Sequence, residues 1–575
     1  MKTKVLILCM YVLVAVYQNI SYANEPLNNT IQLNQVGFTP NSTKLAIVKN
    51  KMAKNFTVVD VNNNKPVYEG RLEKSKKWPY SGEIVKVADF SDYNIGGTYA
   101  IKLDVGIVSS PFIIADSIYA STLFKSTKAY YLNRAGTPIK QEHAGQYARP
   151  SSHPDNIVYI HSSASSKERP ENSVISASKG WFDAGDYNKY IVNSNITVHT
   201  LLAALEDNSA VFNKLDLNIP ESKNGLPDLV DEIIWNLDWM LSMQDPHDGG
   251  IYHKLTTKNF TPFGGAMAHE QNQDRYVVSK SITASLGFAA VMAQASRVLK
   301  PYQDNLPGYS ERLLIAAKAA WEWSKQNPEQ RYVQPSDIKT GIYENKNEPI
   351  EDELSWASSE LFSATGEPHF INDFAIYKTI DAPSWSDVQA LALIALSKST
   401  YTPNDLKQTV KRRLVDLAER WISIDSSSAY RLAITEKDFV WGSNAVVLNK
   451  AFILLRLNKI KKDKRYQNVA QSLLDYVLGR NPLGVSYITG VGHKPVINIH
   501  HRISVTDNIL EPMPGLLSGG PHSGQQDKND CKREGVSYPS SLPALSFLEH
   551  TCSYATNEIA INWNAPLVYV LSSIR

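Results

Sequence analysis

Residues 180–190 read Gly-Trp-Phe-Asp-Ala-Gly-Asp-Tyr-Asn-Lys-Tyr. Two carboxylates, Asp183 and Asp186, stand three residues apart, and Gly185 allows a tight turn that aims both at one point. The aromatic residues beside them supply flat apolar surfaces that suit the faces of sugar rings. Such a cluster can hold and deprotonate a water molecule beside a sugar. A surface turn whose Asp side chains cap the next helix is the plainer interpretation.

A second cluster occupies residues 554–566, Tyr-Ala-Thr-Asn-Glu-Ile-Ala-Ile-Asn-Trp-Asn-Ala-Pro. Glu558 is flanked there by Asn and apolar residues. This setting raises the pKa of a carboxyl group and keeps it protonated near neutral pH. The sequence therefore predicts Glu558 as a general acid.

A third segment, residues 486–494, reads Ser-Tyr-Ile-Thr-Gly-Val-Gly-His-Lys and leads to His500-His501-Arg502. It offers neutral and cationic donors for sugar hydroxyls. Paired His residues also suit a metal ion, but no Cys or second spaced His pair accompanies this one. We predict no metal site here.

These three segments, in this order, resemble the motifs of glycoside hydrolase family 9, an inverting family that includes many cellulases. The resemblance covers nearly the whole chain. Further stretches that match the family are residues 221–228, 248–254, 441–444 and 515–524.

The resemblance implies a mainly α fold, an (α/α)6 barrel preceded by a small immunoglobulin-like β-sandwich. It implies that Glu558 protonates the glycosidic oxygen, that Asp186 takes a proton from the attacking water, and that Asp183 holds this water. In an inverting enzyme the acid and base lie roughly 6.5–9.5 Å apart so that water fits between base and sugar. This chemistry needs no cofactor.

Five more residues are expected to contact substrate because of their places in the matching motifs. They are His253, Trp441, His500, Arg502 and Tyr554. Each has a structural alternative, since Trp441 is also a candidate core residue and Tyr554 a candidate support beneath the acid. His501 is expected to be structural.

The chain departs from the family pattern at two places. Glu549 stands where the family usually carries Asp, so a carboxylate is kept on a side chain that is longer by one methylene group. Many relatives carry a Cys/His zinc site before the Asp-Ala-Gly-Asp run, but residues 134–153 contain no Cys, so we predict no zinc. The resemblance leaves a structural Ca²⁺ open, although no acidic loop has a spacing that demands one.

Charge and the chain's start bear on its partners and location. With 59 basic and 57 acidic residues, the chain has a net charge of +2, which gives no electrostatic field that would attract nucleic acid. A neutral polymer is therefore the better candidate for its binding partner.

Residues 1–23 have the three parts of a secretory signal, which predicts a secreted or periplasmic protein without a membrane span after cleavage. After cleavage of the signal, the mature chain has two cysteines, Cys531 and Cys552. The sequence allows either a disulfide between them or two free, buried thiols.

Hydrophobic periodicity divides the mature chain at about residue 115. Residues 25–115 show short period-two runs that indicate a β-sandwich, and 116–575 show period-3.6 stripes that indicate helices. The strand runs are 44–49, 56–61, 83–88 and 97–103, and the helical stripes are 227–241, 282–298, 312–323, 387–398, 406–422, 445–457, 469–478 and 559–571, with weaker ones at 119–131, 199–205 and 354–362.

We therefore expect a monomeric endo-acting hydrolase of β-1,4-glucosidic bonds in cellulose or related β-glucans. An exo-acting family member such as a cellodextrinase, β-glucosidase or exo-β-glucosaminidase is the alternative, with residues 141–171 as a candidate barrier across the cleft. A non-catalytic glucan-binding protein is a third interpretation, but it has no need of all three acids. The sandwich is expected to brace the barrel, because no Pro/Ser/Thr-rich linker follows it; a carbohydrate-binding module is the alternative.

Overall fold

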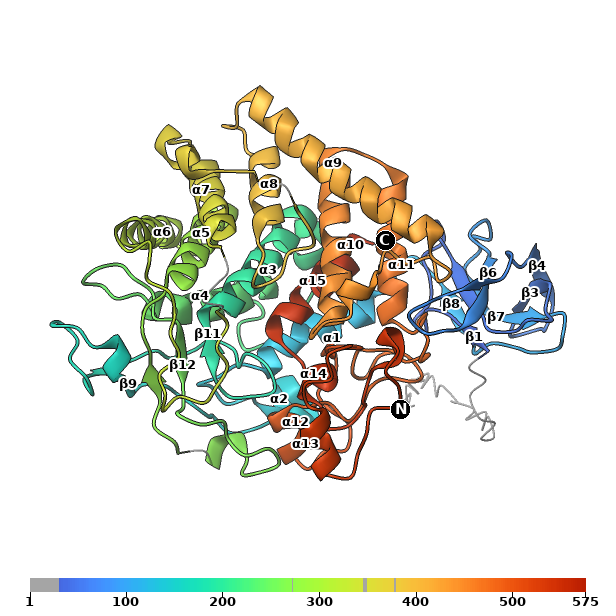
Figure 1. Ribbon diagram of the computed structural model, residues 1–575, viewed down its shortest axis with the longest axis horizontal. Coiled ribbons are helices and arrows are strands. Elements are labelled where there is room, and N and C mark those ends of the chain that lie inside the picture. The colour runs from blue at the N-terminus through green and yellow to red at the C-terminus, as the bar shows by residue number, and fades with distance from the viewer. Residues whose placement is uncertain (1–29, 271, 345–348, 377–378, 575) are drawn as a thin grey trace, which may run out of the picture.

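The computed structural model describes residues 30–270, 272–344, 349–376 and 379–574. A small β-domain lies against one side of a larger helical domain (Figure 1). The predicted secretory signal, residues 1–23, lies outside the described residues. Within the described part of the chain, no helix combines the length and apolar character that crossing a membrane requires.

The N-terminal domain is a sandwich of two four-stranded antiparallel sheets, ordered β1-β2-β6-β5 and β4-β3-β7-β8. The rings of Phe38, Phe90 and Phe112 pack at its centre with centroids 5.3 to 5.7 Å apart. These rings fill the core of a sandwich that contains no Cys. The strands are β1 Ile31–Gln32, β2 Leu45–Val48, β3 Asn55–Asp60, β4 Pro66–Arg71, β5 Lys76–Lys77, β6 Ile84–Asp89, β7 Gly97–Leu103 and β8 Phe112–Ile114.

Six inner helices form a closed ring in which each packs against the next and the last against the first. They are α3 Ile191–Phe212, α5 Ile282–Val298, α7 Glu351–Thr365, α8 Gln389–Lys398, α10 Ser443–Ile460 and α15 Ile561–Ser573. Helices such as α5 and α8 are apolar nearly all round, which suits burial between two layers. This is the (α/α)6 barrel that the resemblance implied.

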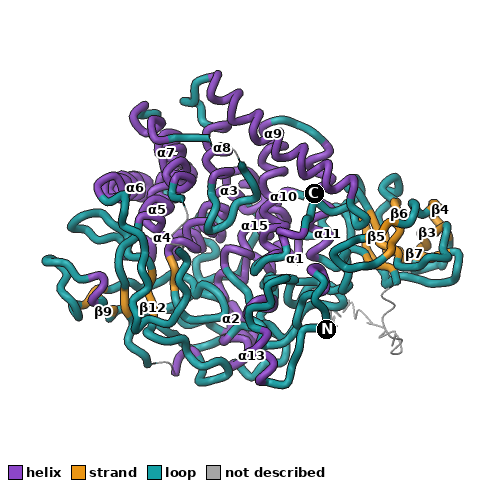
Figure 2. Tube along the Cα trace, viewed as in Figure 1, coloured by secondary structure: helices purple, strands orange, loops and turns teal. Residues whose placement is uncertain are grey.

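Outer helices cover the ring and alternate with the inner helices along the chain (Figure 2). They are α1 Ala120–Leu132, α4 Asp228–Ser242, α6 Tyr309–Gln326, α9 Asn404–Ser427 and α11 Lys464–Val477. Between α7 and α8 the 3₁₀ segment Pro368–Asp373 packs on α7 in place of an outer helix. Outer helices such as α9 and α11 keep a polar face toward solvent, as amphipathic helices do.

Partly buried ion pairs join the inner helices towards their C-terminal ends. Arg456 of α10 contacts Glu206 and Asp207 of α3 at 2.8 and 3.2 Å, and Lys398 of α8 contacts the same two acids at 2.6 and 2.7 Å. Arg297 of α5 also binds Glu206. The cations lie where helix dipoles favour positive charge, so this end of the barrel is tied together. The loops that carry the sequence motifs lie at the opposite end of the barrel, at the N-terminal ends of the inner helices.

Short elements shape those loops. One sheet has the order β10-β9-β13-β12-β11, antiparallel except for the β13–β9 pair. Its strands are β9 Val158–Ile160, β10 Val174–Ile175, β11 Lys189–Tyr190, β12 Lys254–Thr256 and β13 Tyr276–Val277. The short helices are α2 Gln141–Ala144, α12 Arg502–Thr506, α13 Lys528–Arg533 and α14 Tyr554–Asn557. Further 3₁₀ segments are Gly145–Tyr147, Ser162–Ala164, Ala268–Glu270, Lys300–Tyr302, Glu436–Asp438 and Pro543–Leu545.

Candidate active site

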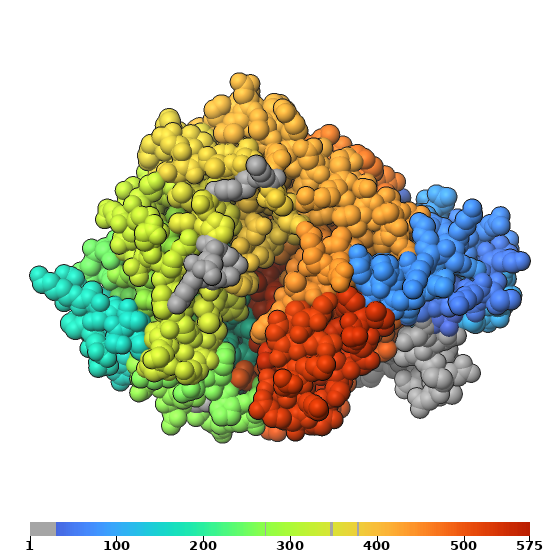
Figure 3. Space-filling model, in the orientation of Figure 1, coloured from blue at the N-terminus to red at the C-terminus, as the bar shows by residue number. Residues whose placement is uncertain are grey.

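Motifs from distant parts of the chain meet at the N-terminal end of the inner ring. The Asp183–Asp186 turn leads into α3, and Glu558 stands just before α15, the neighbour of α3 in the ring. His500 pairs with Glu558 in a short β-bridge, with its N–H 2.8 Å from the Asn557 carbonyl oxygen. The space-filling view shows a groove between the green and yellow surface and the red C-terminal surface (Figure 3).

Gly185 allows the closest approach in this cluster. A Cβ atom at this position would lie 2.3 Å from the backbone oxygen of His500 and 3.1 Å from Oε1 of Glu558. The Gly185 N–H instead donates to Oε1 of Glu558 at 3.2 Å. The glycine therefore lets the acidic turn and Glu558 share one site.

Asp183 is buried and held through both carboxyl oxygens. Oδ1 accepts from Nδ2 of Asn193 at 2.6 Å and Oδ2 from the hydroxyl of Tyr343 at 2.8 Å. Burial raises the pKa of Asp183 to about 8, and the neighbouring charge of Asp186 contributes to the rise. Asp183 is therefore fixed in place and protonated for the most part at neutral pH.

Asp186 has one oxygen in use and one free. Oδ2 accepts from Nδ2 of Asn188 at 2.7 Å and from the hydroxyl of Tyr190 at 3.0 Å. Oδ1 is buried and has no hydrogen-bond partner. A buried, unpaired carboxylate oxygen is costly unless something else occupies it, and water is the simplest occupant.

Glu558 is the second carboxyl group of the site with a raised pKa. Burial raises its pKa well above the ordinary value, and the nearby charge of Asp186 raises it further. Arg502 and the Gly185 N–H act in the other direction, with less effect than burial. A carboxyl group in this environment keeps its proton to a higher pH than an ordinary glutamate and can donate it as a general acid.

His500 and Arg502 both lie beside the acids but differ in what they offer. Nδ1 of His500 lies 2.6 Å from the Thr551 oxygen, and burial lowers the pKa of the ring to about 4, so the neutral ring presents Nε2 as an acceptor. Arg502 donates from Nη1 to the Gly185 oxygen at 2.7 Å and from Nε to the Thr261 oxygen at 2.8 Å. Arg502 thus holds the acidic turn as well as facing Glu558.

An aromatic surface lies at the edge of the site. Trp441 is 43% exposed, and its ring centroid lies 5.4 Å from that of Tyr554. The Tyr554 hydroxyl donates to Oδ2 of Asp530 at 2.9 Å. Exposure of so large an indole argues against a core role for Trp441 and suits a sugar platform.

A disulfide joins Cys531 and Cys552 and thereby settles the choice left open by the sequence. It links α13, which carries Asp530, to the segment just before Tyr554. Glu549, in the same closed loop, accepts from the Ile497 N–H at 3.0 Å and so anchors the chain that leads to His500.

His253 is placed differently from the expected substrate contact. Its side chain is fully buried; Nδ1 lies 2.8 Å from the Ser281 hydroxyl and Nε2 lies 2.6 Å from the Ile342 oxygen. The ring also stacks on Tyr332 with centroids 3.8 Å apart. Both nitrogens are therefore engaged, and His253 fixes the loop that delivers Tyr343.

Several residues of the site gave no sequence signal. Tyr343 and Asn193 hold Asp183, and Phe263 stacks on His500 with ring centroids 4.1 Å apart. Tyr343 and Phe263 lie in loops that are distant in sequence from the residues they contact, and neither belongs to a recognised motif. Asn193 sits in the first turn of α3, where a polar residue alone has no distinctive spacing.

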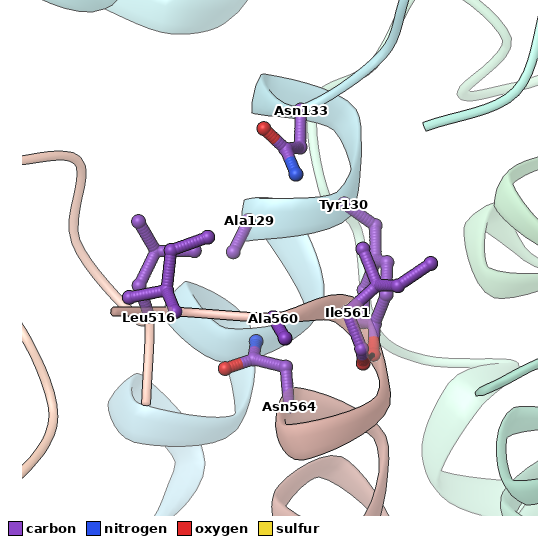
Figure 4. Close-up of a pocket in the computed structure, with 8 residues that line it drawn as sticks. Ala129, Tyr130, Asn133, Leu516, Ala560, Ile561 and Asn564 are labelled. Carbon is purple, nitrogen blue, oxygen red and sulfur yellow. Dashed lines mark hydrogen bonds between the residues drawn. The ribbon is translucent and has the colours of Figure 1, made fainter. Parts of the chain in front are cut away.

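A small cavity is lined by residues of α1 and of the segment that follows Glu558, and by none of the three acids (Figure 4). It lies between Tyr130 of α1 and the start of α15, and Ile559 and Ala560 form part of its wall. The Tyr130 hydroxyl donates to the Ile561 oxygen at 2.8 Å, which fixes the chain after Glu558. The residues around the cavity therefore help to position the loop that bears Glu558.

One group of potential metal ligands occurs among the described residues: Glu534, His550 and Cys552. The Cys552 sulfur is bonded to Cys531 and cannot act as a thiolate ligand. A structural Ca²⁺ stays a prediction from the resemblance.

Comparisons with known proteins agree with this geometry. The model of glycosyl hydrolase family 9 matches residues 119–571, and that of the cellulase N-terminal ig-like domain matches residues 27–106. The chain belongs to glycosyl hydrolase family 9.

Curated family-9 relatives span nearly the whole chain. The xyloglucan-specific endo-beta-1,4-glucanase BoGH9A of Bacteroides ovatus is 39% identical over 95% of this chain and 94% of its own length. Endoglucanase D of Acetivibrio thermocellus is 32% identical over 96% of this chain and 84% of its own length. A solved structure of a Bacteroides ovatus GH9 protein is 37% identical, with a TM-score of 0.88 and coverage of 95% of this chain and 99% of that one.

Proposed function

We propose that this family-9 protein is an inverting endo-β-1,4-glucanase, with Glu558 as general acid and Asp186 as general base. The difference between the two carboxyl groups carries the proposal. Burial favours the protonated form of Glu558, which a general acid requires, whereas Asp186 has a buried oxygen without a hydrogen-bond partner that can accept a proton from water. Inverting hydrolysis requires one carboxyl group as acid and one as base.

In the proposed reaction Glu558 donates its proton to the glycosidic oxygen as the bond breaks. Oδ1 of Asp186 accepts a proton from the water that attacks the opposite face of the sugar. Asp183, whose protonated form is favoured by burial, is proposed to hold that water. The residues proposed to contact the glucan are Trp441, Tyr554, His500 and Arg502, and His253 is reassigned to positioning.

Among β-1,4-glucans, xyloglucan is the polymer to assay first. The B. ovatus relative that matches this chain almost end to end is named as xyloglucan-specific. We further propose that the protein is secreted or periplasmic, on the basis of the signal-like residues 1–23. The expectation of a monomer stays a prediction.

The endo mode is tested by following viscosity and reducing ends together on xyloglucan and on a soluble cellulose derivative. We expect viscosity to collapse while few reducing ends have formed, with Glu558→Gln as the inactive control. Release of one small sugar from the start, with viscosity nearly unchanged, would establish the exo alternative. Binding without any hydrolysis would instead support a glucan-binding protein.

A further inference from the structure

Asn188 lies between the catalytic turn and a buried ion pair. We propose that Asn188, clamped by the Arg275–Asp155 pair, is a positioning residue that aims Asp186 at the attacking water. This inference rests on the proposed function, because it concerns how the base of that reaction is oriented.

The orientation of the Asn188 amide is fixed by the donors around its oxygen. Oδ1 accepts from the Thr257 N–H at 3.0 Å and from Nη1 of Arg275 at 3.1 Å. Both partners are donors, so the amide cannot flip without losing both bonds. Nδ2 must then point to Oδ2 of Asp186, which it meets at 2.7 Å.

Arg275 is itself held on two sides. Its Nε lies 3.0 Å from Oδ1 of Asp155, and its Nη2 donates to the Tyr187 oxygen at 2.9 Å. Asp155 is buried and takes a second cation, with Nζ of Lys189 at 2.8 Å from Oδ2. Arg275 is also almost fully buried, so solvent screens this network little.

The clamp controls which oxygen of Asp186 stays available. Because Asn188 and Tyr190 both donate to Oδ2, the free oxygen of the buried carboxylate is Oδ1. Donors on one oxygen fix the carboxylate plane and so fix the direction of the other oxygen. Arg275 acts on Asp186 through Asn188 and, in addition, holds the turn through the Tyr187 oxygen.

Other charged or titratable groups near Asp186 come from several elements. They are Asp183 in the same turn, Glu558 before α15, Tyr190 of β11, Lys254 of β12, Tyr343 in its loop, and Arg502 of α12 next to Glu558. Burial lowers the pKa of Lys254 to about 7, while the charge of Asp186 opposes this change. A pH test must therefore compare variants that leave all of these groups in place.

Arg275→Met and Lys189→Met form a matched pair for the test. Each removes one of the two cations on Asp155 and leaves the other, and each also removes bonds to backbone oxygens, of Tyr187 for Arg275 and of Ala177 and Lys179 for Lys189. Only Arg275→Met removes a donor from Oδ1 of Asn188, which then keeps the Thr257 N–H. We expect Arg275→Met to lower kcat on the order of 10²-fold with KM nearly unchanged, and Lys189→Met to keep kcat within about threefold.

Asn188→Asp provides a second variant if Arg275→Met does not fold. The new carboxylate still accepts from Arg275 and Thr257, but it places an acidic oxygen where Nδ2 faced Asp186. Like charges so close oppose ionisation, so the acidic limb of the kcat/KM profile should move to higher pH. An aryl cellobioside with a low-pKa phenol should show the same loss, because the base step is affected.

The wild-type protein, assayed on xyloglucan and the aryl cellobioside, separates two failures. Absence of hydrolysis by the wild type would overturn the proposed function. An active wild type with folded Arg275→Met or Asn188→Asp variants that keep kcat and the pH profile would overturn the clamp alone. Equal losses in Arg275→Met and Lys189→Met would assign the network a purely structural role and also overturn it.

Discussion

At the scale of single residues, two carboxyl groups of the site have raised pKa values for the same main reason, burial. For Glu558 the raised pKa means that its proton is retained to a higher pH than that of an ordinary glutamate and is lost only as the pH rises through the raised value. On natural glucans the basic limb of the activity profile should therefore lie well above the pH at which an ordinary glutamate ionises. The limb should disappear for an aryl glycoside whose leaving group needs no proton.

This prediction is checked by measuring kcat/KM from acidic to basic pH with both substrates. The same basic limb for both substrates would contradict the role of Glu558 as acid, because it would then report another group. The sequence indicated the roles of Glu558, Asp186 and Asp183 through local composition and the resemblance. It could not indicate Tyr343, since the contact with Asp183 joins positions 160 residues apart.

At the scale of elements, the disulfide-closed loop supports one wall of the groove. Asp527, four residues before Cys531, accepts from the Ala555 N–H at 2.8 Å and from the Ser553 hydroxyl at 2.7 Å, which fixes the start of α14 beside the disulfide. Replacing both Cys531 and Cys552 by Ser should lower the free energy of unfolding by about 3 kcal/mol, because the disulfide restricts a loop of this length in the unfolded chain. It should also raise KM more than it lowers kcat.

Thermal unfolding and steady-state kinetics of the double Ser variant check this expectation, with the wild type under reducing conditions as a comparison. An unchanged KM together with a lowered Tm would show that the loop stabilises the fold without shaping the groove.

Periodicity located most helices because amphipathic stripes follow from packing in two layers. The predicted stripe 282–298 coincides with α5, and the run 97–103 coincides with β7. The prediction at 199–205 caught only part of α3, which runs from Ile191 to Phe212. The first half of α3 is buried on all sides and includes the polar residues Asn193, which binds Asp183, and Asn195, which faces α5, so no apolar stripe marks it.

At the scale of the whole molecule, the sandwich contacts the loops that bear the site. Gln35 accepts through Oε1 from the N–H groups of His493 and Lys494 at 3.1 and 2.9 Å, in the loop that leads to His500. Trp78 is nearly fully buried and packs on Tyr430 with ring centroids 4.4 Å apart. These contacts favour a brace over an independent binding module.

Trp78→Ala should therefore lower Tm, because truncating a buried Trp typically costs about 3–5 kcal/mol. Removal of residues 25–115 should cause aggregation or earlier melting. Affinity for insoluble glucan should change little in the point variant. A truncated enzyme that is stable and has lost only that affinity would identify the sandwich as a binding module.

The central claim is the division of labour between Glu558 and Asp186. The most direct measurement is the hydrolysis of a low-pKa aryl cellobioside and of a natural glucan by Glu558→Gln and Asp186→Ala. Glu558→Gln should lose the glucan but keep the aryl substrate. Asp186→Ala should lose both by roughly 10² to 10⁴-fold or more, with azide restoring turnover. Near-normal turnover by Asp186→Ala, with Asp183→Ala inactive, would contradict the account and reverse the two roles within the turn.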